Sequence, residues 1–287
     1  MLYLALSVLC SSFIFVIFKL FEVYKVQTLY AIITNYVVAC SVGLVFYQEP
    51  LEPTQIMANS WFYGTLALGV LFILIFNIMA KTSQQIGVSV ASVATKMSLV
   101  IPVVFGVFVY GEILSTLKVL GILLALAAVY FASMKERSIN LSKASLVLPL
   151  LVFLGSGIID TSIKWMQETQ LSQAEYPIFS AVVFAAAAVM GILFILFKSL
   201  KTPIRLNFRN VLGGIALGVP NYFSIYFLLK ALENDQWNSA SIFTINNVAI
   251  VMFSTLLGIL LFKEQLSLKN WVGIIMAVVS ILLVALY

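Results

Sequence analysis

The chain contains few charged residues and no histidine. Asp, Glu, Lys and Arg make up 9% of its 287 residues, whereas soluble domains average about 25%. Because so little polar surface is available, the chain cannot cover a folded core in water. The lack of histidine removes the commonest general base and the commonest transition-metal ligand. These two deficits argue against a soluble enzyme.

The two cysteines, Cys10 and Cys40, lie inside apolar runs, where cysteine behaves as a small hydrophobic residue. We therefore expect no disulfide bond. The sequence has no nucleotide-binding loop, no cluster of metal ligands and no Ser/His/Asp set, so we expect no cofactor, no metal site and no enzymatic activity. The isoelectric point is about 9.1. Since the basic residues flank apolar segments, they favour contact with anionic lipid headgroups over nucleic acid.

Hydrophobic residues make up 62% of the chain. They form repeated runs of about 20 residues, the length that spans a bilayer core of ~30 Å. Short polar breaks between the runs indicate lipid rather than a large soluble core. The sequence therefore predicts an all-α integral membrane protein with ten transmembrane helices, at approximately residues 2–18, 28–46, 60–80, 86–110, 116–133, 145–165, 175–197, 210–230, 238–262 and 268–286.

The sequence also repeats itself. The apolar hairpin at residues 102–131 recurs at residues 254–283, and the tetrapeptide Ala-Leu-Gly-Val occurs in both the third and the eighth apolar run. We interpret residues 1–137 and 143–287 as two five-helix repeats. An odd number of spans in each half would place the two copies in opposite orientations across the membrane.

Polar residues recur at the hairpin links. Ser115 and Ser267 each precede an apolar run and are candidates for helix N-caps. Glu112 and Glu264 lie just before these serines, and a carboxylate is favourable at a helix N-terminus. We therefore interpret both glutamates as caps on the fifth and tenth helices, and not as catalytic acids.

Basic residues are distributed unevenly between the two predicted faces of the membrane. One face has Lys118, Lys164 and Lys230. The opposite face has Lys19, Lys25, Lys81, Lys135, Arg137, Lys143, Lys198, Lys201, Arg205, Arg209, Lys263 and Lys269. The positive-inside rule assigns the richer face to the cytoplasm, which predicts that both termini lie outside.

These features resemble the EamA-type members of the drug/metabolite transporter superfamily. Each half ends with an apolar helix, a short link (Gly111-Glu112 or Lys263-Glu264) and a last helix that contains glycine, and Lys19 and Lys164 end the first and sixth helices. The resemblance covers essentially the whole chain. It implies an inverted repeat of ten helices, a central cavity between the halves and transport by alternating access.

The chain departs from the family pattern in two respects. The family's Pro-x-x-x-Gly spacing is present as Pro102 and Gly106, but its second copy has Ser254 in place of proline. The family also commonly has cytoplasmic termini, whereas the charge distribution here indicates external ones. For the orientation we follow the charges.

Lys96 is the most informative single residue. It lies about ten residues into the fourth apolar run, roughly 15 Å deep, where an ammonium costs about 2.5–3.5 kcal/mol on insertion scales. Ser89, Ser92 and Lys96 share one helical face, which we expect to face a cavity. The repeat partner of Lys96 is Val248, so the cation would make the site asymmetric. The alternative is that Lys96 pairs permanently with an acid and only specifies packing.

Asp160 is the acid that lies well inside an apolar run, one turn after Ser156 and one turn before Lys164. It could pair with Lys164 on its own helix, meet Lys96 across the cavity, or bind and release a proton during transport. The sequence leaves these three roles open.

Neutral polar residues complete the expected substrate site, together with Lys96, Ser92 and Asp160. They are Asn35, Asn77, Asn221, Tyr222, Tyr226, Asn246 and Asn247. Buried amides in lipid need partners, so some of these residues would tie helices together. Pro102 and Pro220 lie inside predicted helices, where each would cause a kink that acts as a hinge or as static shape.

The sequence thus predicts a secondary transporter for a small organic metabolite or a drug, and an amino-acid-like or otherwise anionic or zwitterionic metabolite is one option. It would reside in the cell (inner) membrane as a monomer or weak homo-oligomer. Without an ATP-binding motif, a coupling proton, another ion or solute exchange must drive it. A polytopic enzyme acting on lipid-borne substrates is the main alternative, and a receptor or scaffold that transports nothing is another.

Overall fold

The computed structural model describes residues 2–47, 53–110, 115–134, 143–172, 175–200, 207–232 and 239–286. Twelve helices form within these ranges. They are α1 (Leu2–Val23), α2 (Thr28–Phe46), α3 (Pro53–Ala58), α4 (Phe62–Gln85), α5 (Val88–Met97), α6 (Val100–Tyr110), α7 (Thr116–Ala132), α8 (Lys143–Thr169), α9 (Tyr176–Ser199), α10 (Phe208–Leu232), α11 (Ser239–Phe262) and α12 (Leu268–Leu286). The described ranges contain no strand.

Eight membrane spans can be assigned to the described helices by length and apolar composition, with α5 and α6 counted as one span. Two shorter apolar helices accompany them, Thr116–Ala132 and Leu268–Val284. Helices suit this composition because they satisfy every backbone polar group internally, which lipid cannot do. The prediction of an all-α, multi-pass membrane protein is confirmed.

The structure differs from the predicted spans in several places. Helices α1 and α4 continue to Val23 and Gln85, five residues past their predicted ends, so Lys19 lies inside α1 and the prediction that it ends the first helix is wrong. The short helix α3 lies within a segment that was predicted to be a polar break. The fourth predicted span is not continuous, because Ser98 and Leu99 separate α5 from α6.

The break between α5 and α6 has a local cause. Pro102 has no N–H, so the Ser98 carbonyl cannot accept the usual hydrogen bond from four residues further on. Instead it accepts from the Ile101 N–H at 2.9 Å. Pro102 thus adjoins an interruption two residues beyond Lys96. Pro220 behaves differently, since α10 continues through it.

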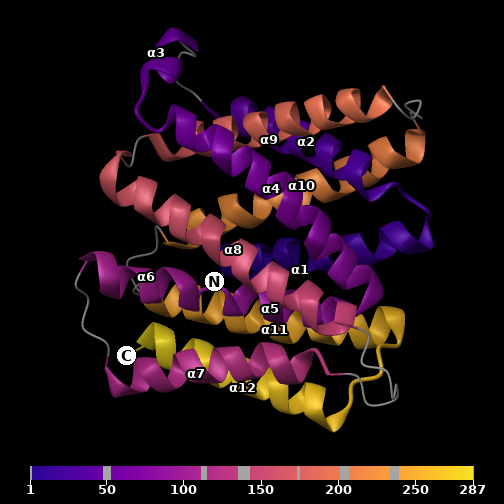
Figure 1. Cartoon of the computed structure of the whole chain (residues 1–287), viewed down its shortest axis with the longest axis vertical. Coiled ribbons are helices and arrows are strands. Elements are labelled where there is room, and N and C mark those ends of the chain that lie inside the picture. The colour runs from indigo at the N-terminus through magenta and orange to yellow at the C-terminus, as the bar shows by residue number, and fades with distance from the viewer. Residues whose placement is uncertain are drawn as a thin grey trace.

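The helices run side by side along a common direction, and α7 and α12 form a pair at one edge of the bundle (Figure 1). Small residues allow this pair to approach closely. A Cβ atom on Gly273 would collide with the backbone of Ala132, and one on Gly121 would lie 2.8 Å from Val284 Cγ2. The Ser280 hydroxyl donates a hydrogen bond of 2.7 Å to the Gly121 carbonyl across the same contact. Such close packing of small residues is typical of helix pairs in membranes.

Glu264, in the link between α11 and α12, caps a different helix from the one predicted. Its carboxylate accepts hydrogen bonds from the Val88 N–H at 2.6 Å and from the Ser89 hydroxyl at 2.8 Å, so it caps α5. The N-terminus of α12 is capped by Ser267, whose hydroxyl accepts from the Asn270 N–H at 3.2 Å. The prediction for Ser267 is therefore confirmed and that for Glu264 is wrong, because its partner lies in the other half of the chain.

Ser115 also caps a helix as predicted, since its hydroxyl accepts from the Lys118 N–H at 3.1 Å at the start of α7. Glu112, its predicted companion, lies outside the described residues.

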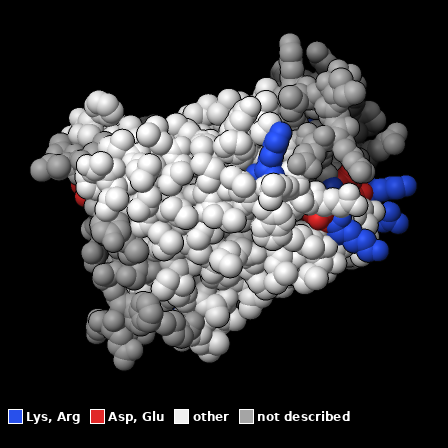
Figure 2. Space-filling view, turned by 90° about the horizontal axis from the view of Figure 1, so that it is seen from below, with Lys and Arg blue, Asp and Glu red and all other residues white. Residues whose placement is uncertain are grey.

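Lys and Arg side chains gather toward one end of the bundle, the right-hand end in Figure 2, where Figure 1 places the α11–α12 connection. We call this the basic end.

Side-chain hydrogen bonds join helices at the basic end. Gln84, at the end of α4, donates from Nε2 to the Phe18 carbonyl at 3.0 Å and to the Thr28 hydroxyl at 3.1 Å. Asn210, at the start of α10, exchanges two hydrogen bonds with Gln27, of 2.9 and 3.1 Å. Together with Glu264, these contacts connect α1, α2, α4, α5 and α10 at one end of the molecule.

Candidate functional site

A cavity of about 400 Å³ lies between α1, α4, α5, α8, α10 and α11. We call it the central cavity. Its volume is within the range of small-molecule sites, about 300–1,000 Å³. On α8, α10 and α11 the lining residues lie at the middle of the helix or in the half that points away from the basic end. Helix α1 contributes from its middle, and α4 contributes residues as far as Met79, in the half toward the basic end. The central cavity is thus positioned deep within the apolar bundle.

Lys96 and Asp160 both line the central cavity, from α5 and α8 respectively. Lys96 is half-buried and Asp160 is exposed to the cavity space. Their charges are opposite, yet within the described residues they do not form a direct ion pair at 4.0 Å or less. A cation and an anion that share a cavity without a direct ion pair can each bind one end of a zwitterionic ligand. The structure thus places Asp160 in the same cavity as Lys96, and its three possible roles stay predictions.

The break between α5 and α6 positions a serine against the acid. Ser98 lies in the break, and its hydroxyl is 3.1 Å from Asp160 Oδ2 and 2.6 Å from the Thr95 carbonyl. A hydroxyl has a single hydrogen to donate, so the two oxygens compete for it. Sequence reasoning missed Ser98, although its place four residues before Pro102 was a signal that its backbone would leave the regular helix.

Two residues of the lining carry a polar atom without a partner. Asn246 is 2% exposed and Ser156 is 6% exposed, and neither Asn246 Oδ1 nor Ser156 Oγ has a hydrogen-bond partner. A buried polar group without a partner costs about 1–3 kcal/mol. Asn247 lines the cavity beside Asn246. Both atoms are enclosed by the surrounding protein, so a ligand in the cavity would reach them only if the cavity wall moved.

Aromatic residues form much of the apolar wall of the central cavity. They come from α1, α4 and α11 and include Phe15, Phe72, Phe76 and Phe243. Sequence reasoning did not select them because 22 phenylalanines in a membrane protein offer no way to tell cavity from core. They make the space between the charged groups apolar.

Four residues predicted for the substrate site lie elsewhere. Asn35 and Asn221 are buried and bond to each other, with Asn221 Nδ2 donating to Asn35 Oδ1 at 3.1 Å, so they join α2 to α10. Asn77 donates to the Ile73 carbonyl of its own helix at 2.7 Å. The buried Ser92 donates to the Ser89 carbonyl at 2.9 Å. None of the four is in the described lining of the central cavity.

The predicted stripe of Ser89, Ser92 and Lys96 is therefore divided between three environments. Ser89 contacts Glu264 at the basic end, Ser92 is buried, and Lys96 reaches the central cavity. The bend after α5 and the packing of α5 against α8 and α11 orient this face, and neither can be read from helical spacing.

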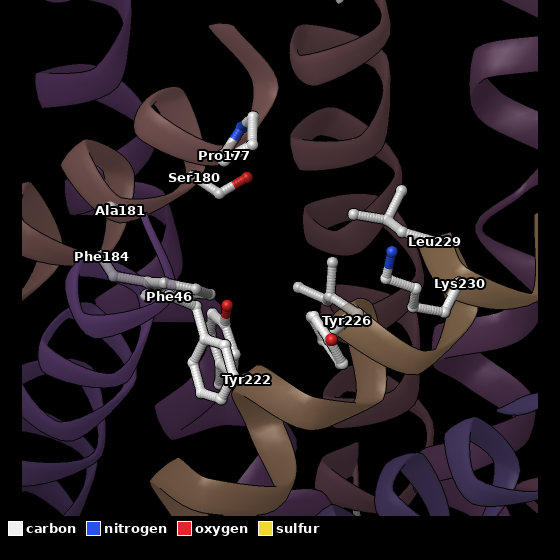
Figure 3. Close-up of a pocket in the computed structure, with 11 residues that line it drawn as sticks. Phe46, Pro177, Ser180, Ala181, Phe184, Tyr222, Tyr226, Leu229 and Lys230 are labelled. Atoms are coloured by element: carbon white, nitrogen blue, oxygen red, sulfur yellow. The ribbon is translucent and has the colours of Figure 1, made fainter. Parts of the chain in front are cut away.

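Tyr222 and Tyr226 line a second cavity, of about 350 Å³, between α2, α9 and α10 (Figure 3). We call it the side cavity. It lies next to the central cavity, because Ile225 lines both. The predicted site residues are thus divided between two cavities: Lys96, Asp160, Asn246 and Asn247 are in one, and the two tyrosines are in the other.

Comparison with known proteins agrees with this architecture. A sequence model of the EamA-like transporter family matches residues 143–286. A protein of Haemophilus influenzae, described only as an uncharacterized protein, is 30% identical over 290 residues, which cover 97% of this chain and 95% of the relative. A crystal structure of a protein with 16% identity superposes with a TM-score of 0.60 over 98% of this chain and 96% of that chain, a likeness of fold alone. The chain therefore belongs to the EamA-like transporter family.

Proposed function

We propose that this protein is a secondary transporter that carries a small zwitterionic or anionic organic solute through the central cavity. The observation that carries the proposal is that Lys96 and Asp160 line one cavity deep in the apolar bundle, together with the unpartnered Asn246. A charged group inside a membrane is costly and is usually functional. A solute with a carboxylate and an ammonium would offset both charges.

We also propose that residues 1–137 and 143–287 form two inverted five-helix repeats, with ten spans in all. The contacts between the halves support this, since exchanging each helix for its repeat partner converts one observed contact into another. The proposed repeat pairs α1 with α8, α2 with α9, α4 with α10 and α5 with α11. The packing of α2 on α10 then corresponds to the packing of α9 on α4. In the same way, the packing of α1 on α10 corresponds to that of α8 on α4, and the packing of α1 on α11 corresponds to that of α8 on α5. Inverted repeats of this kind place the substrate site between the halves.

One departure from this symmetry supports alternating access. α1 packs against α4 and is bonded to it at the basic end, where the Ser83 hydroxyl donates to the Phe15 carbonyl at 2.8 Å. The counterpart pair, α8 and α10, has little contact within the described residues. We propose that the basic end is closed in this structure and that the central cavity opens at the opposite end. In the other state of the transport cycle, α8 and α10 would pack together and close the opposite end, while α1 and α4 would separate and open the basic end. Alternation between these two states would carry the solute across.

The charge distribution supports an orientation. If the basic end faces the cytoplasm, as the positive-inside rule indicates, both termini lie outside the cell and the cavity opens outward. We propose the cell (inner) membrane as the location, and a proton, another ion or a second solute as the coupled species.

A ligand-stabilisation screen tests the proposed substrate class. The purified protein is heated with metabolites grouped as zwitterions, anions, cations and neutral compounds. Ligands that bind the folded state raise its melting temperature, and we expect the strongest responses from zwitterions, followed by anions. Uptake of each responding compound is then measured in proteoliposomes. Stabilisation by cations alone would contradict the proposed roles of Lys96 and Asp160.

A further inference from the structure

The side cavity differs from the central cavity in its walls. Phe46, Tyr222 and Tyr226 form an aromatic cluster on one side of it, with ring centroids 6.0 Å apart for Phe46–Tyr222 and 6.1 Å for Tyr222–Tyr226. Both pairs are stacked, with interplanar angles of 24° and 20°. Phe184 adds a fourth ring from α9. A flat apolar ligand can stack on such a wall.

Polar groups lie around the same space. Figure 3 shows the Lys230 ammonium, the Ser180 hydroxyl and the hydroxyls of Tyr222 and Tyr226 around the opening between α9 and α10. The Ser180 hydroxyl donates to the Tyr176 carbonyl at 2.9 Å, so toward a ligand it offers lone pairs. The tyrosine hydroxyls can donate or accept.

The described lining of the side cavity contains one basic residue, Lys230, and no acidic residue. Among these described residues the only charge is positive, in contrast to the lysine and aspartate of the central cavity. An ammonium has three N–H donors, so Lys230 can donate to a ligand anion as well as to another partner. We propose that the side cavity is a second binding site, for an organic anion that contains an aromatic ring.

In this site the ring lies against Phe46, Tyr222 and Tyr226, and the anionic group accepts hydrogen bonds from Lys230 and from a tyrosine hydroxyl. Ile225 separates the bound anion from the central cavity. The side cavity is independent of the proposed transport site, because it shares none of the residues that hold the solute there.

Binding of three matched naphthalene compounds tests the site. 1-Naphthoate, 1-naphthamide and 1-naphthylmethylamine carry negative, neutral and positive charge on the same ring system. Each is titrated by calorimetry into the full chain in nanodiscs of phosphatidylcholine. We expect the naphthoate to bind most tightly. The Lys230→Gln variant should weaken naphthoate binding roughly tenfold, the size of a charge-assisted hydrogen bond, and leave the binding of the amide nearly unchanged.

Further variants separate the aromatic and polar contributions. Tyr226→Phe removes a hydroxyl and keeps the ring, whereas Tyr226→Leu also removes the ring and should weaken all three compounds by roughly fivefold. Lys118→Gln is the matched control, because Lys118 lies at the same end of the molecule but outside both described linings. Circular dichroism and gel filtration verify that each variant is folded.

Several results would overturn the proposal. They are equal or tighter binding of the cationic compound, an unchanged naphthoate affinity in Lys230→Gln, and no binding in lipid, which would mean that a phospholipid occupies the cavity. Weaker binding in Lys96→Gln would also overturn it, because the naphthoate would then be in the central cavity. None of these results depends on whether the central cavity transports a solute.

Discussion

The two cavities have similar volumes and share Ile225, yet their chemistry differs. The central cavity has one lysine, one aspartate and an amide oxygen without a partner. The side cavity has one lysine, no acid in its described lining and a stacked aromatic wall. Adjacent spaces in one bundle can therefore favour different ligands, since in a low dielectric a single charge decides which ligand is tolerated.

Replacing Asp160 by asparagine would give the central cavity the same charge as the side cavity. We expect Asp160→Asn to lower uptake of a zwitterion by roughly 10- to 100-fold, because a charge-assisted hydrogen bond of ~1.5–3 kcal/mol is lost. Uptake of the corresponding anion, which lacks the ammonium, should fall much less. Competition between the two solutes in proteoliposomes measures this.

The control for this change is Glu168→Gln, which neutralises an exposed acid on the same helix, α8. It should leave uptake of both solutes unchanged. An equal loss of zwitterion and anion uptake in Asp160→Asn would mean that Asp160 does not recognise an ammonium.

Substitutions at two buried asparagines distinguish a binding role from a structural role. Asn246 Oδ1 has no partner, so Asn246→Leu should leave the melting temperature unchanged or higher, while uptake falls about tenfold. Asn35→Leu removes the acceptor of Asn221 Nδ2, so it should lower the free energy of unfolding by about 1–3 kcal/mol. Thermal unfolding and uptake are measured on both. Destabilisation by Asn246→Leu comparable to that by Asn35→Leu would assign Asn246 to the scaffold.

Glu264 contributes to neither described lining but supports the helix that carries Lys96. Glu264→Ala removes the acceptor for the Val88 N–H and the Ser89 hydroxyl. Loss of a cap costs ~1 kcal/mol, so amide exchange at the start of α5 should rise about fivefold. Hydrogen–deuterium exchange measures this, with the start of α12 as the internal reference because Ser267 caps it. Unchanged exchange at Val88 and Ser89 would show that Glu264 does not hold α5.

The smallest effect is expected at Glu175, which precedes α9 beside the side cavity. Hydrogen bonds from the Ser172 N–H and hydroxyl lower the pKa of Glu175 below its ordinary value of 4.5, and the Trp61 indole N–H adds to this. The carboxylate therefore stabilises the fold above pH 4.5, and this contribution disappears as the pH falls through the lowered value. Glu175→Gln should lower the melting temperature by roughly 1–2 °C at pH 7. The difference from wild type should vanish in acid, and a difference that grew as the pH fell would contradict this assignment.

Much of the fold could be predicted from the sequence, because long apolar runs with short breaks have few solutions in lipid. The position of the break after α5 was not predicted, because a proline indicates a bend without showing which residue leaves the helix. The site was harder. Asn35 and Asn246 look alike in sequence, and they differ in whether the side-chain oxygen has a hydrogen-bond partner. The partner of Asn35 is Asn221, which lies 186 residues away in the sequence, whereas Asn246 Oδ1 has no partner.

Charged residues were the more reliable guide. Lys96 and Asp160 were selected because burying a charge in lipid is costly, and the structure brings both to one cavity. Tyr222 and Tyr226 were selected as part of the same site, but tyrosine is common at membrane depth and carries no comparable cost. The neighbours that place them in the side cavity, from α2 and α9, become apparent only in three dimensions.

Uptake by the Lys96→Ala variant tests the central claim most directly. The solute that gives the largest thermal stabilisation of wild type is loaded outside proteoliposomes, and uptake is compared between wild type, Lys96→Ala and Lys81→Ala, an exposed lysine on α4. We predict that Lys96→Ala abolishes uptake while the protein remains folded and that Lys81→Ala transports normally. Unchanged uptake by folded Lys96→Ala would contradict the account.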